Sequence, residues 1–148
     1  MTVDNNTSFD IPEMEELLSP QFLRPTLEGI VGVQEHRGAV PETEGGVVEP
    51  WTHVECAMAI DAGSFHDEAG KAYEWLAGVQ LPDGSWYASY QNGLPKDTYK
   101  VSHAISYIAV GVWHHYLITG DLSFLKEMWP SVERAINCLL YTSDAADE

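Results

Sequence analysis

The stretch Gln80-Leu81-Pro82-Asp83-Gly84-Ser85-Trp86 decides the fold, because the chain carries an earlier, degenerate copy of it. The copy, Gln34-Glu35-His36-Arg37-Gly38-Ala39-Val40, keeps the Gln-x-x-x-Gly-x-(bulky apolar) spacing at an offset of 46 residues (80 − 34 and 84 − 38). A Gly-Val pair precedes both copies. A period in this range, with helical sequence between the copies, is typical of stacked helix pairs that cannot bury their apolar faces singly.

The segments around the two copies carry apolar residues at helical spacing. Residues 53–62 and 102–119 are apolar on nearly all sides, as expected of buried helices, whereas the other segments have one apolar stripe. This alternation predicts an inner layer of buried helices and an outer layer of amphipathic ones, an all-α fold without strands. The expected helices span 20–34, 53–62, 64–79, 102–119 and 122–129, with a further one opened by Pro130.

Several residues mark where these helices should begin and end. Ser19, followed by a proline, has the pattern of an N-cap with a first-turn proline. Gly120 stands where a helix commonly ends in the left-handed conformation, and Asp121 is placed to cap the next helix.

The last eleven residues, Cys138 to Glu148, resemble the conceptual translation of a transposon-type sequencing adapter. We therefore expect three segments: a flexible acidic N-terminus over 1–19, a helical domain over 20–137, and an adapter-derived tail over 138–148. The chain is then the N-terminal part of a longer protein, and it is expected to expose apolar flanks of its last helix pair and to aggregate easily when expressed alone. Those flanks comprise Val112, Leu125, Val132 and Ile136.

Composition excludes several classes of function. The formal net charge is −16, and −13 without the three acids of the suspected tail (−16 + 3), which argues against nucleic acid and against anionic membrane surfaces. No stretch has the length of a membrane span or the pattern of a signal peptide, so we expect a cytoplasmic protein. Two cysteines give no disulfide framework and no zinc spacing. The adjacent pair His114-His115 cannot ligate one ion well, since neighbours on a helix point about 100° apart, and neither a metal nor a cofactor is expected.

The Gln-x-x-x-Gly-x-Trp motif at Gln80 resembles the repeat of terpenoid cyclases and protein prenyltransferases, which share an α/α toroid. Thr119-Gly120-Asp121, followed by Phe124-Leu125 and Pro130, is similar to six-hairpin, glucoamylase-like glycosidases. The resemblance covers about residues 27–137 and is strongest to bacterial proteins known as prenyltransferase-like. It implies that this chain holds about two and a half of six helical hairpins, with long loops gathered around a central cavity.

Acidic and aromatic residues are concentrated in the two long loops and at the starts of the helices that follow. Trp51, His53, Trp86, Tyr90 and His103 are candidates for substrate binding, since aromatic rings stack on the apolar faces of sugars. Glu55 and Asp97 are the candidate catalytic carboxylates, because glycoside hydrolysis uses an acid and a nucleophile or base. Glu55 opens an otherwise apolar helix, and Asp97 is equivalent to Trp51 under the 46-residue offset (51 + 46).

A structural role is the alternative for each of these residues. We expect a structural role for Gln80, Gly84 and Trp86, in which the glutamine amide bonds to a helix end and the tryptophan packs on the neighbouring helix pair. Asp83 is the turn residue of Pro-Asp-Gly. For Glu55 the alternative is a charge at the start of a helix, and one residue of the His114-His115 pair is expected to bond within the core.

The leading interpretation is the N-terminal part of a carbohydrate-active, glycoside hydrolase-like toroid that takes a small-molecule or oligosaccharide ligand and is inactive as a fragment. Two alternatives remain open. One is an isoprenoid cyclase or prenyltransferase-like protein, in which the same aromatics would stabilise carbocations. The other is a catalytically silent toroid that serves as a binding module.

Overall fold

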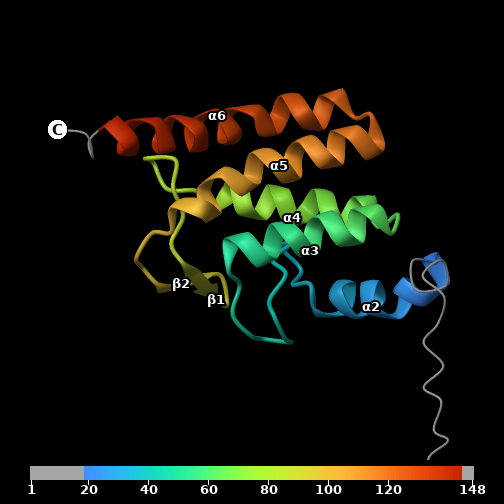
Figure 1. Cartoon of the computed structure of the whole chain (residues 1–148). Coiled ribbons are helices and arrows are strands. Elements are labelled where there is room, and N and C mark those ends of the chain that lie inside the picture. The colour runs from blue at the N-terminus through green and yellow to red at the C-terminus, as the bar shows by residue number, and fades with distance from the viewer. Residues whose placement is uncertain (1–18, 145–148) are drawn as a thin grey trace, which may run out of the picture.

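The computed structural model describes residues 19–144, which form five helices and one two-stranded sheet (Figure 1). The prediction of an all-α fold is confirmed. The expected acidic segment lies, except for its last residue, outside the described residues. The helices are α2 (Pro20–Val33), α3 (Pro50–Ala62), α4 (His66–Gly78), α5 (Ser102–Thr119) and α6 (Leu122–Asp144).

The predicted caps are confirmed at the start of α2 and at the junction of α5 and α6. The Ser19 hydroxyl accepts the Phe22 N–H at 3.2 Å and begins α2. Gly120 ends α5 with a φ of +69°, and its N–H donates to the Tyr116 carbonyl. Asp121 Oδ1 then accepts the N–H groups of Ser123 and Phe124 at 2.8 and 3.0 Å, which begins α6.

The prediction that Pro130 opens a separate helix is wrong, because α6 continues through it. Proline removes one N–H donor from a helix interior, and tertiary packing can compensate for that loss. Met128 and Val132, on either side of the proline, are both buried in the core. The amphipathic stripe of α6 therefore stays continuous across the proline.

A β-hairpin, which the sequence interpretation did not include, interrupts the second long loop. Strand β1 (Ser89–Gln91) pairs antiparallel with β2 (Leu94–Asp97), with an irregularity between Ser89 and Tyr90. The turn residues Asn92 and Gly93 both have positive φ, of 53° and 73°. An Asn-Gly pair is the strongest short-range signal for such a turn, so the sequence did carry the information.

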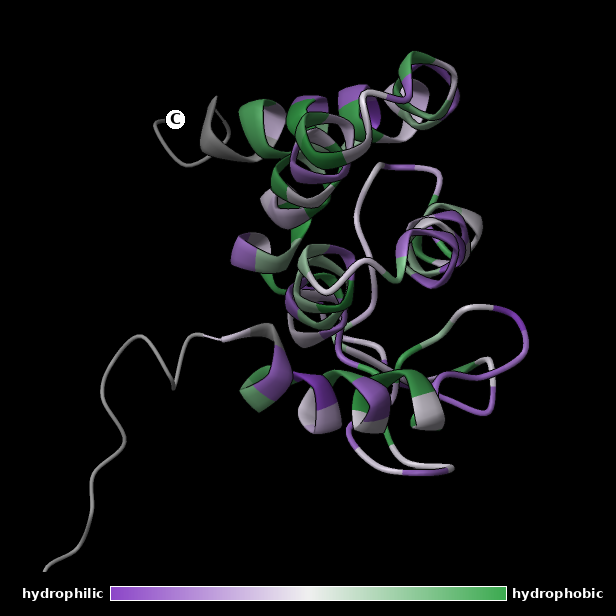
Figure 2. Cartoon of the chain, turned by 90° about the vertical axis from the view of Figure 1, so that its right-hand side faces the viewer, coloured by the Kyte–Doolittle hydropathy of each residue, from purple (hydrophilic) through white to green (hydrophobic). Residues whose placement is uncertain are grey.

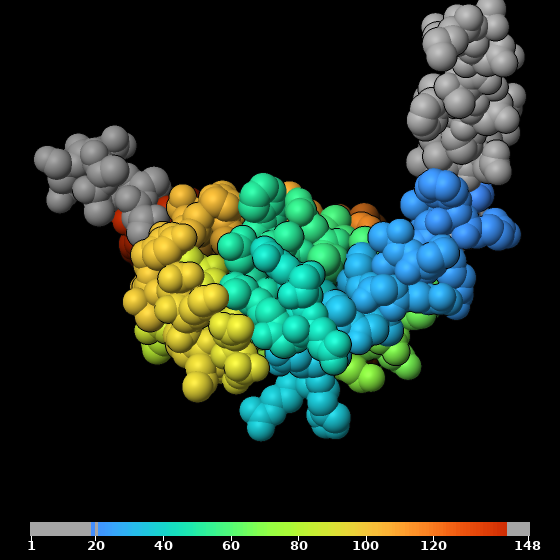
Figure 3. All heavy atoms as spheres, turned by 90° about the horizontal axis from the view of Figure 1, so that it is seen from below, coloured from blue at the N-terminus to red at the C-terminus, as the bar shows by residue number. Residues whose placement is uncertain are grey.

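The helices stack so that α3 contacts α2, α4 and α5, and α5 contacts α4 and α6. Figure 2 looks nearly along α3 and α4, whereas α2 runs across the view. In Figure 3, which shows the molecule from below, the hairpin in yellow lies on one side of α3 and α2 in blue on the other. Residues of α3, α4, α5 and α6 form one core, including Val54, Ile60, Tyr73, Leu76, Ile108, Val112, Met128 and Val132.

The two Gln-x-x-x-Gly copies form the same hydrogen-bonded turn. Gln34 Nε2 donates to the carbonyls of Gly38 and Glu68 at 3.0 and 2.9 Å. Gln80 Nε2 donates to the carbonyls of Gly84 and Ser131 at the same two distances. Each glutamine thereby ties its own turn to the next amphipathic helix, α4 in the first case and α6 in the second.

The helices leave an apolar edge on α5 and α6, but not where the sequence predicted it. Val112 and Val132 are buried, so that prediction was wrong for both, whereas Ile136 is 40% exposed and Leu125 is partly buried. Val112 and Val132 belong to the shared core. The exposed stripe lies on another face of α5, where Val110, Trp113 and Leu117 recur at helical spacing. No helix among the described residues is long and apolar enough to cross a membrane.

Replacement of Gly84 by alanine tests the repeated turn. A Cβ there would lie 2.1 Å from the Arg134 carbonyl oxygen, at a φ of +88°. We expect Gly84→Ala to lower the free energy of unfolding by about 3 kcal/mol, because neither the backbone conformation nor the space suits a side chain. Gly45 is the control, since its φ is +65° but nothing lies near its Cβ position; Gly45→Ala should cost only about 1 kcal/mol. Urea unfolding with equal losses in the two variants would contradict the close approach.

Candidate functional site

Three aromatic residues meet where α3 and α5 begin. The indole ring of Trp51 packs edge to face with the imidazole of His103, with ring centroids 5.1 Å apart, and with the ring of Tyr107 at 5.8 Å. Trp51 is 41% exposed, and His103 is also exposed. A large aromatic ring that is fixed by T-shaped contacts with two other rings and is partly exposed to solvent is suited to stacking on an apolar ligand face.

Glu55 lies one helical turn after Trp51 and joins this group. The Tyr107 hydroxyl donates to Glu55 Oε1 at 3.4 Å, and the Glu55 side chain is exposed. The N-terminal turns of two helices meet here, and their free N–H groups favour negative charge nearby. We refer to Trp51, Glu55, His103 and Tyr107 as the aromatic–carboxylate cluster. Three of its four members were predicted as site residues from the sequence, and Tyr107 was not.

His53 lies on the opposite side of α3 and is fully buried. Its Nδ1 accepts the Val40 N–H at 3.1 Å, so Nε2 carries the proton and donates to the Ala72 carbonyl at 2.8 Å. Burial lowers the pKa of His53 to about 4, so the ring is neutral. This histidine joins the first loop to α4 and does not reach the cluster.

Trp86 and Tyr90 are also in the core, each only 2% exposed. The Trp86 indole N–H donates to the Leu76 carbonyl at 2.7 Å, which ties the second loop to α4. The Tyr90 hydroxyl accepts the Tyr87 N–H at 3.1 Å and lies 3.3 Å from the Val79 carbonyl oxygen. Burial raises the pKa of Tyr90. Both positions are used for packing in the described residues, and their role in ligand binding stays a prediction.

Asp97 lies at the end of β2, exposed, and bonds within the hairpin. Its Oδ2 accepts the Ser89 hydroxyl at 2.6 Å. The 46-residue offset that equated Asp97 with Trp51 does not extend this far, because the second loop is longer: the carbonyls held by the two glutamines, of Glu68 and Ser131, are 63 residues apart (131 − 68). Of the two predicted carboxylates, only Glu55 contacts an aromatic residue of the cluster.

A second polar group, not predicted as a unit, surrounds Asp61 near the far end of α3. Asp61 is fully buried, and its two carboxylate oxygens contact His66 Nδ1 at 2.7 Å and His115 Nδ1 at 3.0 Å. Burial raises the pKa of Asp61, but the hydrogen bonds and charges of His115 and His66 outweigh it and hold the pKa below the usual value. The expectation that one residue of the His114-His115 pair bonds within the core is confirmed for His115.

Two further polar atoms near Asp61 are buried without a hydrogen-bond partner, the Tyr73 hydroxyl and His114 Nδ1. His114 Nδ1 lies 3.6 Å from Asp61 Oδ2, beyond hydrogen-bond range. Burial, with the charge of Asp61, raises the pKa of Tyr73 strongly. Within residues 19–144 no set of three histidine, cysteine, aspartate or glutamate side chains is arranged to hold a metal ion. The Asp61 group therefore joins α3, α4 and α5 through a buried carboxylate.

Comparison with known proteins gives relatives named for glycoside hydrolysis. The chain is 42% identical over 130 residues to the MMP endo-(1,4)-3-O-methyl-alpha-D-mannosidase of Mycolicibacterium hassiacum, a match that covers 88% of this chain and 36% of that protein. It is 31% identical over 84 residues to an uncharacterized glycosyl hydrolase of Methanocaldococcus jannaschii, covering 56% of this chain and 14% of that protein. No protein-family model matches the chain. The chain thus spans about a third of the length of the first relative, and these relatives support a glycosidase-like protein in general terms.

The buried carboxylate gives a prediction about pH. Because the folded pKa of Asp61 is below its ordinary value of about 4, its ionised form stabilises the fold above that pH, and this contribution is lost as pH falls through the folded pKa. Asp61→Asn should lower the free energy of unfolding by about 1–3 kcal/mol at pH 7 and flatten the acid side of the stability profile.

Asp67→Asn is the matched control, since Asp67 is exposed in the first turn of α4. Urea unfolding between pH 3 and pH 7 distinguishes the two variants. If the Asp61→Asn and Asp67→Asn profiles coincide, the hydrogen bonds from His66 and His115 do not stabilise the fold.

Proposed function

We propose that this chain is part of a glycoside hydrolase and that the aromatic–carboxylate cluster contributes to its substrate site. The observation that carries the proposal is the position of the Glu55 carboxylate, accepting a hydrogen bond from Tyr107 beside the exposed face of Trp51. The relatives named for glycoside hydrolysis support the same class of reaction. The resemblance to α/α toroids accords with the succession of paired helices around one shared core.

In this proposal each member of the cluster has a distinct role. Trp51 stacks on the apolar face of a sugar ring, and its T-shaped contacts with His103 and Tyr107 keep the indole in place. Glu55 acts as one of the two carboxyl groups that glycoside hydrolysis needs, with Tyr107 orienting it. Asp97 stays the other acidic candidate in this chain, on the hairpin beside the start of α3 (Figure 3). The separation of the two carboxyl groups would decide between retention and inversion at the anomeric carbon.

We further propose an α-linked mannoside as the substrate class, on the strength of the printed name of the Mycolicibacterium relative and the 42% identity. Methoxy groups on such a substrate would add apolar contact area, which suits a site built around an indole ring. The isoprenoid cyclase alternative has no comparable support, since neither relative is named for that chemistry.

A chimera tests this proposal, because the chain corresponds to only 36% of the relative. We expect that exchanging the matched segment of the Mycolicibacterium enzyme for this chain preserves release of reducing ends from a 3-O-methylated α-(1,4)-mannan oligosaccharide. In that chimera, Glu55→Gln should lower kcat by about 100-fold or more, since the loss of an acid–base group typically costs 10²–10⁴-fold.

Trp51→Ala in the same chimera should raise KM by about tenfold, because a stacking contact worth ~1.4 kcal/mol is lost. Glu133→Gln, an exposed position on α6, is the control and should leave both constants unchanged. A folded chimera whose Glu55→Gln variant keeps full kcat would remove Glu55 from the proposal. A folded chimera that hydrolyses none of the mannosides would overturn the proposed substrate class.

A further inference from the structure

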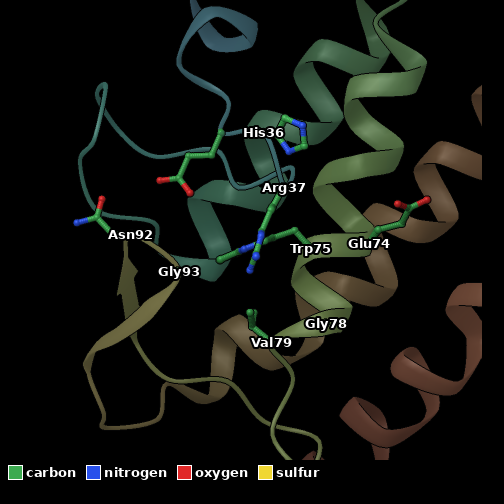
Figure 4. Close-up of a pocket in the computed structure, with 9 residues that line it drawn as sticks. His36, Arg37, Glu74, Trp75, Gly78, Val79, Asn92 and Gly93 are labelled. Carbon is green, nitrogen blue, oxygen red and sulfur yellow. The ribbon is translucent and has the colours of Figure 1, made fainter.

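A second polar depression lies away from the aromatic–carboxylate cluster and shares no residue with it. It has a volume of about 710 Å³, within the range of about 300–1,000 Å³ that small-molecule sites occupy. Three segments form its walls, as Figure 4 shows: the turn with Glu35, His36 and Arg37, the last turns of α4 with Glu74 and Gly78, and the hairpin turn at Asn92. We refer to it as the Arg37 pocket.

The polar side chains around the Arg37 pocket are unused within residues 19–144. Glu35, His36, Arg37, Glu74 and Asn92 make no side-chain hydrogen bond or ion pair with any of the described residues. In Figure 4 the Arg37 side chain lies in the middle of the pocket, between the hairpin turn and α4. Arg37 is thus the central hydrogen-bonding side chain of the pocket, while in Figure 4 the side chains of Asn92 and Glu74 lie at opposite edges and point away from it.

The repeat builds a related depression a second time. Positions 82, 83 and 137 line a smaller pocket of about 420 Å³, and they correspond to His36, Arg37 and Glu74 (36 + 46, 37 + 46 and 74 + 63). In the second copy the polar group at the turn is used internally: Asp83 forms an ion pair with Lys100 and accepts the Ser85 hydroxyl. The first copy keeps the pocket but leaves the equivalent residue, Arg37, without such partners.

The walls of the Arg37 pocket are held in place by backbone and amide hydrogen bonds. Gln34 fixes the turn through the Gly38 and Glu68 carbonyls, and within the turn the Gly38 N–H donates to the Glu35 carbonyl at 2.8 Å. The hairpin is tied to the first loop by Gln91 Nε2, which donates to the Gly45 carbonyl at 3.1 Å. A site whose walls are already ordered loses little conformational entropy when a ligand binds.

The chemistry of the lining points to an uncharged ligand. The lining contains one guanidinium, one imidazole and two carboxylates, so charges of both signs surround the pocket and neither an anion nor a cation is favoured by all of them. Guanidinium, carboxylate and amide groups are planar and present paired donors or acceptors, which match neighbouring hydroxyl groups. We propose that the Arg37 pocket binds a neutral saccharide, as a second carbohydrate site of this protein.

The choice of a saccharide as the ligand rests on the proposed function, whereas the location of the Arg37 pocket does not depend on it. The test is a ¹H–¹⁵N NMR titration of the intact chain with mannotriose and with maltotriose, and with inorganic phosphate as the charged comparison. We expect saturable shifts of the backbone amides of Arg37, Gly78 and Gly93 with at least one saccharide, with a Kd on the order of 1 mM, and none with phosphate. Arg37→Ala should weaken binding by about tenfold or more through loss of a charge-assisted hydrogen bond.

Gly78 offers a variant that blocks the pocket without disturbing the fold, because nothing lies within 4 Å of its Cβ position. Gly78→Phe should abolish the saccharide shifts, whereas Gly70→Phe should retain them. Gly70 is the matched control, since it lies on the same helix with equally open space and does not line the pocket. Trp51→Ala should also retain them, which separates the Arg37 pocket from the aromatic–carboxylate cluster.

Three results would overturn the inference. The first is that neither saccharide causes saturable amide shifts. The second is that the saccharide shifts persist in the Gly78→Phe variant, and the third is that phosphate shifts the same amides. Loss of hydrolysis in the Glu55→Gln chimera bears only on the aromatic–carboxylate cluster, so either proposal can fail while the other stands.

Discussion

One side-chain amide, used twice, sets the spacing of the helices. Gln34 and Gln80 each direct Nε2 at two carbonyls, one in their own turn and one in the next amphipathic helix. The glycine four residues on makes this possible, because it packs directly against the backbone of that helix with a positive φ. With α4 and α6 fixed to these turns, α3 and α5 bury their core-facing sides, including Val54, Ile60 and Ile108, whereas Val110, Trp113 and Leu117 of α5 stay exposed. In the second copy Gln80 Oε1 is also occupied, by Ser131 and Arg134, so every polar atom of that side chain is used.

The sequence was sufficient to predict this framework because each of its requirements is local. Each copy of the turn needs a glutamine and, four residues later, a glycine. The helices can be told apart as well, because the spacing of apolar residues differs between a buried helix and a half-buried one. The two errors in element assignment have identifiable causes. Pro130 suggested a helix start, but buried neighbours on both sides keep α6 continuous. Asn92-Gly93 is a local hairpin signal that was outweighed by the helical pattern of the whole chain.

The candidate site was predicted in part, and the limits follow from geometry. Trp51, Glu55 and His103 come together because they occupy the first two turns of adjacent helices, which an alternation of loops and helices implies. His53 does not join them, since two residues along a helix is a rotation of about 200°, which turns its ring into the core. Asp97 was placed by a constant offset, and the longer second loop breaks that offset. Neither the pairing of Asp61 with His115, 54 residues away, nor the joint lining of the Arg37 pocket by three segments leaves a local pattern in the sequence.

The two glutamines reach their partner helices over very different lengths of chain. Glu68 follows Gln34 by 34 residues, whereas Ser131 follows Gln80 by 51, yet both hydrogen bonds to those carbonyls measure 2.9 Å. The extra 17 residues (51 − 34) therefore leave the contact between turn and helix unchanged. Part of this length is the β-hairpin in the second loop. The turns and helices therefore tolerate loops of different length, so the residues that a loop carries can change without altering how the turn is joined to its helix.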